Sequence, residues 1–128
     1  MKSRATGTFE VKMTPQDSTT GIGRFVLDKI FHGDLEAVSQ GEMLSIGTAT
    51  AGSAGYVALE VVTGKLSGRS GAFALQHSGI MNRGAPSLSL QVIPDSGTLE
   101  LTGLVGTMAI DRSDGNHQYV LEYELPDS

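Results

Sequence analysis

The sequence predicts an all-β fold, a closed eight-stranded antiparallel meander barrel, from three observations. Short apolar segments alternate with polar residues at the two-residue period of a strand. The chain has 17 glycines in 128 residues, well above the usual share of about 7%, and they separate these segments at intervals of roughly eight to twelve residues. No segment has the apolar stripe of an amphipathic helix. Closure into a barrel is expected because it removes exposed edge strands.

The first half of the chain contains five predicted strands, each bounded by turn residues such as Gly, Asp and Ser. They cover residues 7–13, 23–33, 34–44, 44–52 and 55–64. The segment 23–33 is apolar on both alternating faces, with Phe31 on one face and Val26 and Ile30 on the other. Such a pattern is typical of a strand that is covered on both sides.

The second half contains up to five more strands, which brings the total to between eight and ten. They cover residues 71–81, 87–93, 97–103, 106–111 and 117–125. In the last of these, Tyr119, Leu121 and Tyr123 share one face and alternate with polar residues. That face is expected to lie in the core.

One internal repeat links two parts of the chain. The segment LSGRSGAFAL, residues 66–75, aligns without gaps on LTGLVGTMAI, residues 101–110. Paired glycines supply positive φ angles in tight turns. We therefore expect two closely similar hairpins, at Gly68–Gly71 and Gly103–Gly106, within a single barrel domain that covers residues 1–128.

Composition excludes several classes of protein. The net charge is −5, with 9 basic and 14 acidic residues and no Lys/Arg cluster, so no nucleic-acid partner is expected. The absence of cysteine excludes disulfides and thiol nucleophiles. The start of the chain has no apolar signal region, and no apolar run approaches the length of a membrane span. A cytoplasmic location without a membrane partner is expected.

No metal or cofactor site is predicted. The chain has three histidines, His32, His77 and His117, and their spacing matches no metal-binding motif. No glycine-rich segment lies between a strand and a helix, so a dinucleotide cofactor is not expected.

The chain resembles a family of small bacterial proteins, a domain of unknown function grouped with the allene oxide cyclase-like β-barrels. The resemblance extends from about residue 7 to residue 125. It rests on four segments in order, FHGDLEAVSQGEML, YVALEVVTGKLSGRSGAFALQHSG, PDSGTLELTGLVGTMAID and HQYVLEY. It implies a closed eight-stranded antiparallel meander barrel but supplies no activity.

More distantly, the chain is similar to plant allene oxide cyclases and dirigent proteins, which hold a hydrophobic substrate in the barrel mouth and steer a cyclisation or coupling. None of their catalytic residues can be matched to a residue here. A likeness of fold alone does not establish a function.

His77 and Glu60 are the candidate catalytic residues. His77 shares its parity with Phe73 and Leu75, which predicts that it faces the barrel interior. Glu60 precedes it across a Gly-rich turn, where the two would lie diagonally on neighbouring strands if the hairpin is centred between Arg69 and Ser70. A carboxylate buried there would have a raised pKa, as a general base requires. Alternatively, His77 is a structural residue and Glu60 lies on the outer face.

Five further residues are candidates for ligand binding. Tyr56 shares the parity of Glu60, and Phe73 and Met81 share that of His77, so all three are expected to line the interior. His32 is expected at the rim, and Arg83 could pair with a substrate carboxylate. Alternatively, His32 and Arg83 are solvated turn residues.

Two functions of different class agree with these patterns. The first is a barrel that binds a small hydrophobic molecule, with isomerase or cyclase activity as an option; whether there is turnover stays open. The alternative is a structural or interaction module that acts through oligomerisation. A homo-oligomer is expected because the strand that contains Val26 and Ile30 is apolar on both faces.

Overall fold

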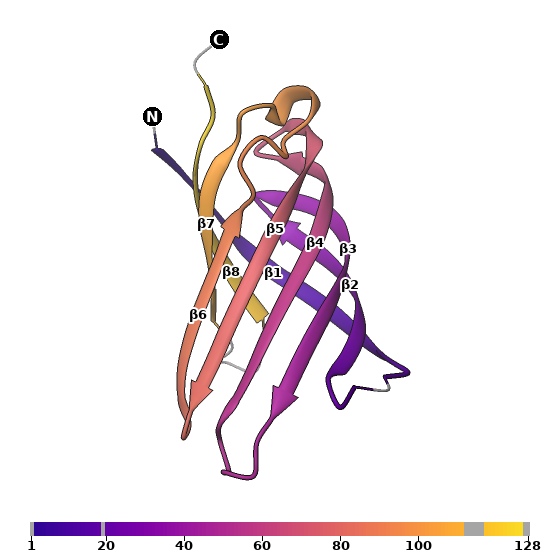
Figure 1. Cartoon of the computed structure of the whole chain (residues 1–128). Coiled ribbons are helices and arrows are strands. Elements are labelled where there is room, and N and C mark those ends of the chain that lie inside the picture. Colours follow the sequence, from indigo (N-terminus) through magenta and orange to yellow (C-terminus); the bar gives the residue numbers. More distant parts are fainter. Residues whose placement is uncertain (1, 19, 112–116, 127–128) are drawn as a thin grey trace.

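The chain forms one closed antiparallel barrel of eight strands (Figure 1), which confirms the predicted fold class. The structure is a computed structural model and describes residues 2–18, 20–111 and 117–126. The strands are β1 (Lys2–Gln16), β2 (Gly23–Gly33), β3 (Leu35–Gly47), β4 (Ala54–Leu66), β5 (Arg69–Asn82), β6 (Ala85–Val92), β7 (Val105–Asp111) and β8 (His117–Glu124). Each strand pairs with the next in sequence, and β8 pairs with β1 to close the barrel.

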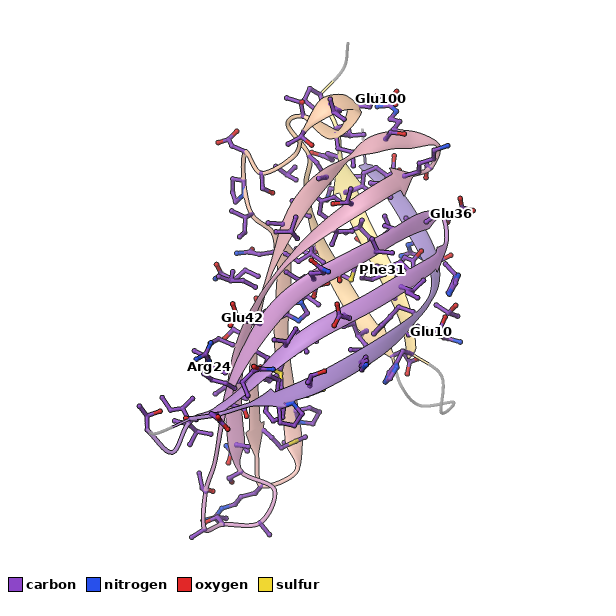
Figure 2. All side chains as sticks on the ribbon, turned by 90° about the vertical axis from the view of Figure 1, so that its right-hand side faces the viewer. Glu10, Arg24, Phe31, Glu36, Glu42 and Glu100 are labelled. Carbon is purple, nitrogen blue, oxygen red and sulfur yellow. The ribbon has the colours of Figure 1, made fainter. Side chains whose placement is uncertain are left out.

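Alternation decides which side chains fill the barrel. On β4, Ala58 and Val62 are buried, whereas Val57, Leu59 and Val61 are 52%, 56% and 56% exposed. The same rule holds on β2, where Phe31 lies in the interior (Figure 2). One parity of each strand therefore faces the inside, as the pleat of a sheet requires.

One end of the barrel is filled and covered. The 3₁₀ helix η1 (Leu99–Leu101) lies over the end drawn at the top of Figure 1. Leu101 and Leu104 are fully buried there, and Leu66 and Phe73 belong to the same apolar cluster. An eight-stranded barrel is just wide enough for its side chains to fill it, so this half has a packed core.

The hydroxyl of Tyr119 on β8 stabilises the turn between β2 and β3. It donates a hydrogen bond to the carbonyl of His32 at 2.9 Å and accepts one from the backbone N–H of Leu35 at 2.9 Å. Burial raises the pKa of this phenol above its ordinary value. A buried Tyr thus hydrogen-bonds backbone groups on both sides of this turn.

Two strand predictions are wrong. Residues 97–103 form the turn and helix η1 instead of a strand. Residues 44–52 do not form a separate strand, because Leu44–Gly47 extends β3 and the rest is turn. Within the described ranges, no helix is long and apolar enough to cross a membrane.

The prediction of two similar hairpins is also wrong. The first copy of the repeat is the tight β4–β5 turn, but the second follows η1 and leads into β7. What the copies share is the first glycine, since Gly68 and Gly103 have φ angles of 84° and 83°. Gly71 and Gly106 are not in the positive-φ region. A Cβ at Gly71 would lie 2.2 Å from the carbonyl oxygen of Thr98, so close backbone approach explains this glycine.

We expect Gly71→Ala to lower the free energy of unfolding by about 1–3 kcal/mol, because the added methyl group overpacks against the backbone at Thr98. Gly47→Ala is the matched control, since a Cβ there meets nothing within 4 Å. Urea denaturation of the three proteins measures the difference. Equal unfolding midpoints for the two variants would contradict the steric explanation.

Candidate functional site

A single buried carboxylate, that of Glu60 on β4, forms the centre of the candidate site. Glu60 is 1% exposed and His77 is 3% exposed, so both face the interior, as the parity of His77 predicts. The β4–β5 register pairs Glu60 with Leu75 and Ala58 with His77. The hairpin is therefore centred between Ser67 and Gly68, not between Arg69 and Ser70. His77 is a diagonal neighbour of Glu60, as predicted. It follows the residue opposite Glu60 on β5, whereas the predicted register had it precede that residue.

The Glu60 carboxylate accepts hydrogen bonds from three side chains. Its Oε2 atom lies 2.8 Å from Lys29 Nζ and 2.5 Å from His77 Nε2, and its Oε1 atom lies 2.9 Å from Ser39 Oγ. The four residues come from β2, β3, β4 and β5. We call this group the Glu60 cluster; it joins four consecutive strands inside the barrel.

Lys29 and Ser39 were not among the residues predicted from the sequence, although the signal was present. Lys29 shares its parity with Leu27 and Phe31, and Ser39 shares its parity with Leu35. All of these face the interior. A Lys on a core parity is rare unless it is paired, and its partner lies two strands away.

The expected rise in the pKa of Glu60 is wrong in direction. Burial alone raises this pKa, but the hydrogen bonds and positive charge of His77 and Lys29 together outweigh it and lower the pKa to about 2. Glu60 is thus ionised at neutral pH. It is a hydrogen-bond acceptor and an anchor for positive charge rather than a general base.

The ionised carboxylate fixes the tautomer of His77. A carboxylate only accepts hydrogen bonds, so His77 Nε2 must carry the proton that is shared with Glu60. The second ring nitrogen, Nδ1, is then the atom that accepts or releases a proton. This arrangement of carboxylate and imidazole is the one that general bases use in many hydrolases.

Two adjoining cavities lie in the half of the barrel away from η1. The inner chamber has a volume of about 260 Å³. Its wall includes Phe9, Leu27, Lys29, Met43, Tyr56, Ala58, His77, Ile110 and His117. The outer chamber, of about 610 Å³, shares Met43, Tyr56 and Ile110 with it and extends to Met81, Pro86 and Leu88. Both chambers have mostly apolar walls, and the outer chamber has a size typical of small-molecule sites.

The inner chamber places charge beside aromatic rings. Lys29 Nζ lies 5.1 Å from the centre of the Phe9 ring and 5.9 Å from that of Phe31. The ring of His117 stacks on Phe9 with centres 4.9 Å apart. Lys29 and His77 contribute to the wall of this chamber, whereas Glu60 lies behind them.

Gly79 makes room for Tyr56 at the junction of the chambers. The two residues are opposite each other on β5 and β4. A Cβ at Gly79 would lie 2.2 Å from an edge atom of the Tyr56 ring. The Tyr56 ring centre is 6.4 Å from that of His77, so the glycine allows the phenol to lie close to the imidazole.

The structure brings together some of the predicted site residues and separates others. Tyr56, Met81 and His77 line the two chambers. Phe73 is buried in the filled half. His32 lies on the outer surface, where its Nε2 is 2.7 Å from Glu10 Oε2.

Arg83 occupies the exposed β5–β6 turn with a φ angle of 49°. Its backbone N–H donates a hydrogen bond to Ser53 Oγ at 3.1 Å. In the part of the chain that the structure describes, no three His, Asp or Glu side chains form a group that could hold a metal ion.

Because the Glu60 pKa is lowered from 4.5 to about 2, we expect this carboxylate to contribute stability that is complete above pH 4.5. That contribution, about 3 kcal/mol, is lost as the pH falls towards 2. Glu60→Gln should therefore show a smaller decrease in the free energy of unfolding between pH 4.5 and 2 than the native chain. Urea denaturation at several pH values measures the slope.

Glu36→Gln, at an exposed position on β3, is the matched control and should keep the native slope. If the unpaired Lys29 makes Glu60→Gln too unstable to measure, the double variant Lys29→Met/Glu60→Gln provides the same comparison. Parallel curves for the native and Glu60 variants would contradict the assignment.

Comparison with known proteins supports the fold and identifies the family. A profile described as "Protein of unknown function (DUF3224)" matches residues 5–123. A crystal structure of a DUF3224 protein of unknown function from Shewanella oneidensis MR-1 is 51% identical, with a TM-score of 0.94 and complete coverage of both chains. No curated protein matches. The chain therefore belongs to the DUF3224 family, and it has the same fold as this solved structure.

Proposed function

We propose that the chain binds a small, mainly apolar molecule in the two chambers and that His77 transfers a proton to or from it. The observation behind the proposal is that His77, on the wall of an apolar cavity, is hydrogen-bonded to a buried ionised carboxylate. Apolar pockets with a few convergent polar groups are the usual form of a small-molecule site. Proton transfer within one bound molecule is the chemistry of an isomerase or a cyclase.

In this mechanism Glu60 is a positioning residue. It holds Nε2–H of His77 and leaves Nδ1 as the base. When Nδ1 takes a proton, the ring becomes cationic, and the adjacent carboxylate stabilises that charge in a site of low dielectric constant. Lys29 keeps Glu60 ionised during the cycle. The likeness of the sequence to allene oxide cyclase-like barrels supports a cavity of this kind.

We expect Ala58→Leu to abolish binding of para-nitroanisole, a neutral aromatic probe, because Ala58 lines the inner chamber and a larger side chain there would fill it. Val61→Leu on the outer face of the same strand is the control. Chemical-shift perturbation of backbone amides measures binding. The ligand-binding proposal fails if the native chain shows no perturbation around the chambers at millimolar probe.

We expect the native chain to speed deuterium uptake from D₂O into beta-tetralone, a ketone with acidic C–H bonds, and His77→Asn to lose that effect by roughly a hundredfold. NMR of the ketone measures the rate. His32→Asn, the same change on the outer surface, is the control. Equal rates for the two variants would rule out proton transfer by His77.

A second candidate function, an interaction module that forms a homo-oligomer, is favoured by the outer surface of β3, β4 and β5. We define the outer apolar face as Val38, Leu44, Val57, Leu59, Val61 and Ile80, which are between 40% and 56% exposed. Ile30 on β2, expected to be covered on its outer side, is 46% exposed in the single chain. Contiguous exposed apolar surface of this kind usually marks an interface.

A second copy of the chain suits this face. The outward column on β4 consists of Val57, Leu59 and Val61. A two-fold axis that crosses the strand at Leu59 places Val57 of one copy against Val61 of the other. The ion pair between Arg24 and Glu42, at 3.1 Å (both residues are labelled in Figure 2), lies beside this column, because Glu42 is opposite Leu59 in the β3–β4 register. Such an interface would need to bury more than about 1,000 Å².

We expect the native chain to be a dimer and Leu59→Glu to be a monomer, because the substitution places two carboxylates at the two-fold axis. Leu99→Glu, at an exposed position on η1, is the control and should remain dimeric. Size-exclusion chromatography with light scattering measures the mass. A monomeric native chain would remove this candidate function.

A further inference from the structure

We infer that the Lys29 ammonium is a binding site for the carbonyl oxygen of an apolar ketone and for the enolate oxygen that forms when the ketone loses a proton. The inference rests on the proposed function and gives it a substrate class, an enolisable ketone with an apolar body. It assigns to Lys29 a direct contact with the ligand, in addition to its ion pair with Glu60.

The first argument is the hydrogen-bonding capacity of Lys29. An ammonium group has three donors and no acceptor. Among the described residues, Glu60 Oε2 at 2.8 Å is the hydrogen-bond acceptor for one of them. The faces of Phe9 and Phe31 attract the charge but offer no lone pair. Lys29 lines the inner chamber with a side chain that is 7% exposed, and its ammonium is therefore suited to an oxygen atom of a ligand.

The second argument is the position of Lys29 relative to His77. Both side chains bond to the same oxygen atom, Glu60 Oε2, so the ammonium and the imidazole are necessarily neighbours. In a ketone the carbon that loses the proton is bonded to the carbonyl carbon, so the base and the oxygen site must also be neighbours. The cluster meets this requirement with one cation and one base on the same chamber wall.

The reaction balances without a further reactant. The C–H bond next to the carbonyl breaks, its proton goes to His77 Nδ1, and the electron pair moves onto the oxygen as an enolate. The Lys29 ammonium stabilises that charge, as fixed donors do in an oxyanion site. Return of the proton to the same carbon, or to a conjugated carbon, regenerates neutral His77 and gives exchange or isomerisation.

The rest of the chamber restricts the substrate class. Leu27, Met43, Ala58 and Ile110 provide apolar walls around the cluster. The remaining titratable groups on these walls are Tyr56 and His117, so no carboxylate lines this chamber among the described residues. A molecule with one oxygen and an apolar body matches this distribution better than a sugar or a diacid.

A pair of probes tests the oxygen site. Para-nitrophenolate carries a planar delocalised oxyanion like that of an enolate, and para-nitroanisole has nearly the same shape without the charge. We expect the native chain to bind the phenolate at least tenfold more tightly than the neutral phenol, which lowers the apparent pKa of the bound probe by about one unit. The visible absorbance of the phenolate reports this ratio.

We expect Lys29→Met/Glu60→Gln, which removes both charges of the pair, to lose the preference for phenolate over the neutral probe. Glu60→Gln alone keeps the ammonium and should keep the preference. Lys65→Met, the same loss of a Lys at an exposed position on β4, is the matched control and should behave like the native chain. The double variant also avoids an unpaired buried carboxylate, which could unfold Lys29→Met.

The inference is overturned if the double variant still prefers phenolate, or if the native chain binds para-nitroanisole but shows no preference. In both cases the apolar cavity, and with it the proposed ligand binding, remains supported. If the native chain binds neither probe, the proposed function itself fails.

Discussion

The ionised carboxylate of Glu60 in the barrel interior is the constraint on which this structure depends. Water is excluded from it, so its charge must be matched by neighbouring side chains. Lys29, Ser39 and His77 do this from β2, β3 and β5. The same hydrogen bonds hold four consecutive strands in one register and fix the tautomer of the imidazole. Structural and chemical roles therefore coincide in one group of side chains.

The two halves of the barrel differ, since one is a packed core and the other contains the cavities. Helix η1 covers one end, where its own Leu101 packs with Leu66 and Phe73 in the apolar core. In the other half, Ala58 is a small residue on the wall of the inner chamber, and Gly79 makes room for the ring of Tyr56. A rigid apolar core at one end can thus support a polar cluster at the wall of a cavity, which is the arrangement that a precise site requires.

The outer surface contrasts with the interior. The barrel is closed, because every strand, including β1 and β8, has two neighbours. In the proposed homo-oligomer, the copies would meet through the outer apolar face. The pairing of β6 with β7 is the least extensive in the barrel, since the two strands share one register pair, Gln91 with Thr107. Local opening is easiest where few ladder bonds must break.

Local pattern in the sequence determined most of the strands, the closed barrel and the inward direction of His77, because alternation and glycine spacing are short-range properties of the chain. The same pattern predicted that Glu60 and His77 are diagonal neighbours, although the predicted centre of the hairpin was wrong. Only the tertiary structure decided the ionisation of Glu60. Lys29 is 31 residues away in sequence and reaches the carboxylate across an intervening strand. The hydrogen bond from His77 and the charge of Lys29 together reverse the pKa shift that burial alone would give. The second copy of the repeat likewise differs from the first because η1, and not a preceding strand, leads into it. Charge, register and packing across several strands are set by the whole fold, so they cannot be derived from one segment at a time.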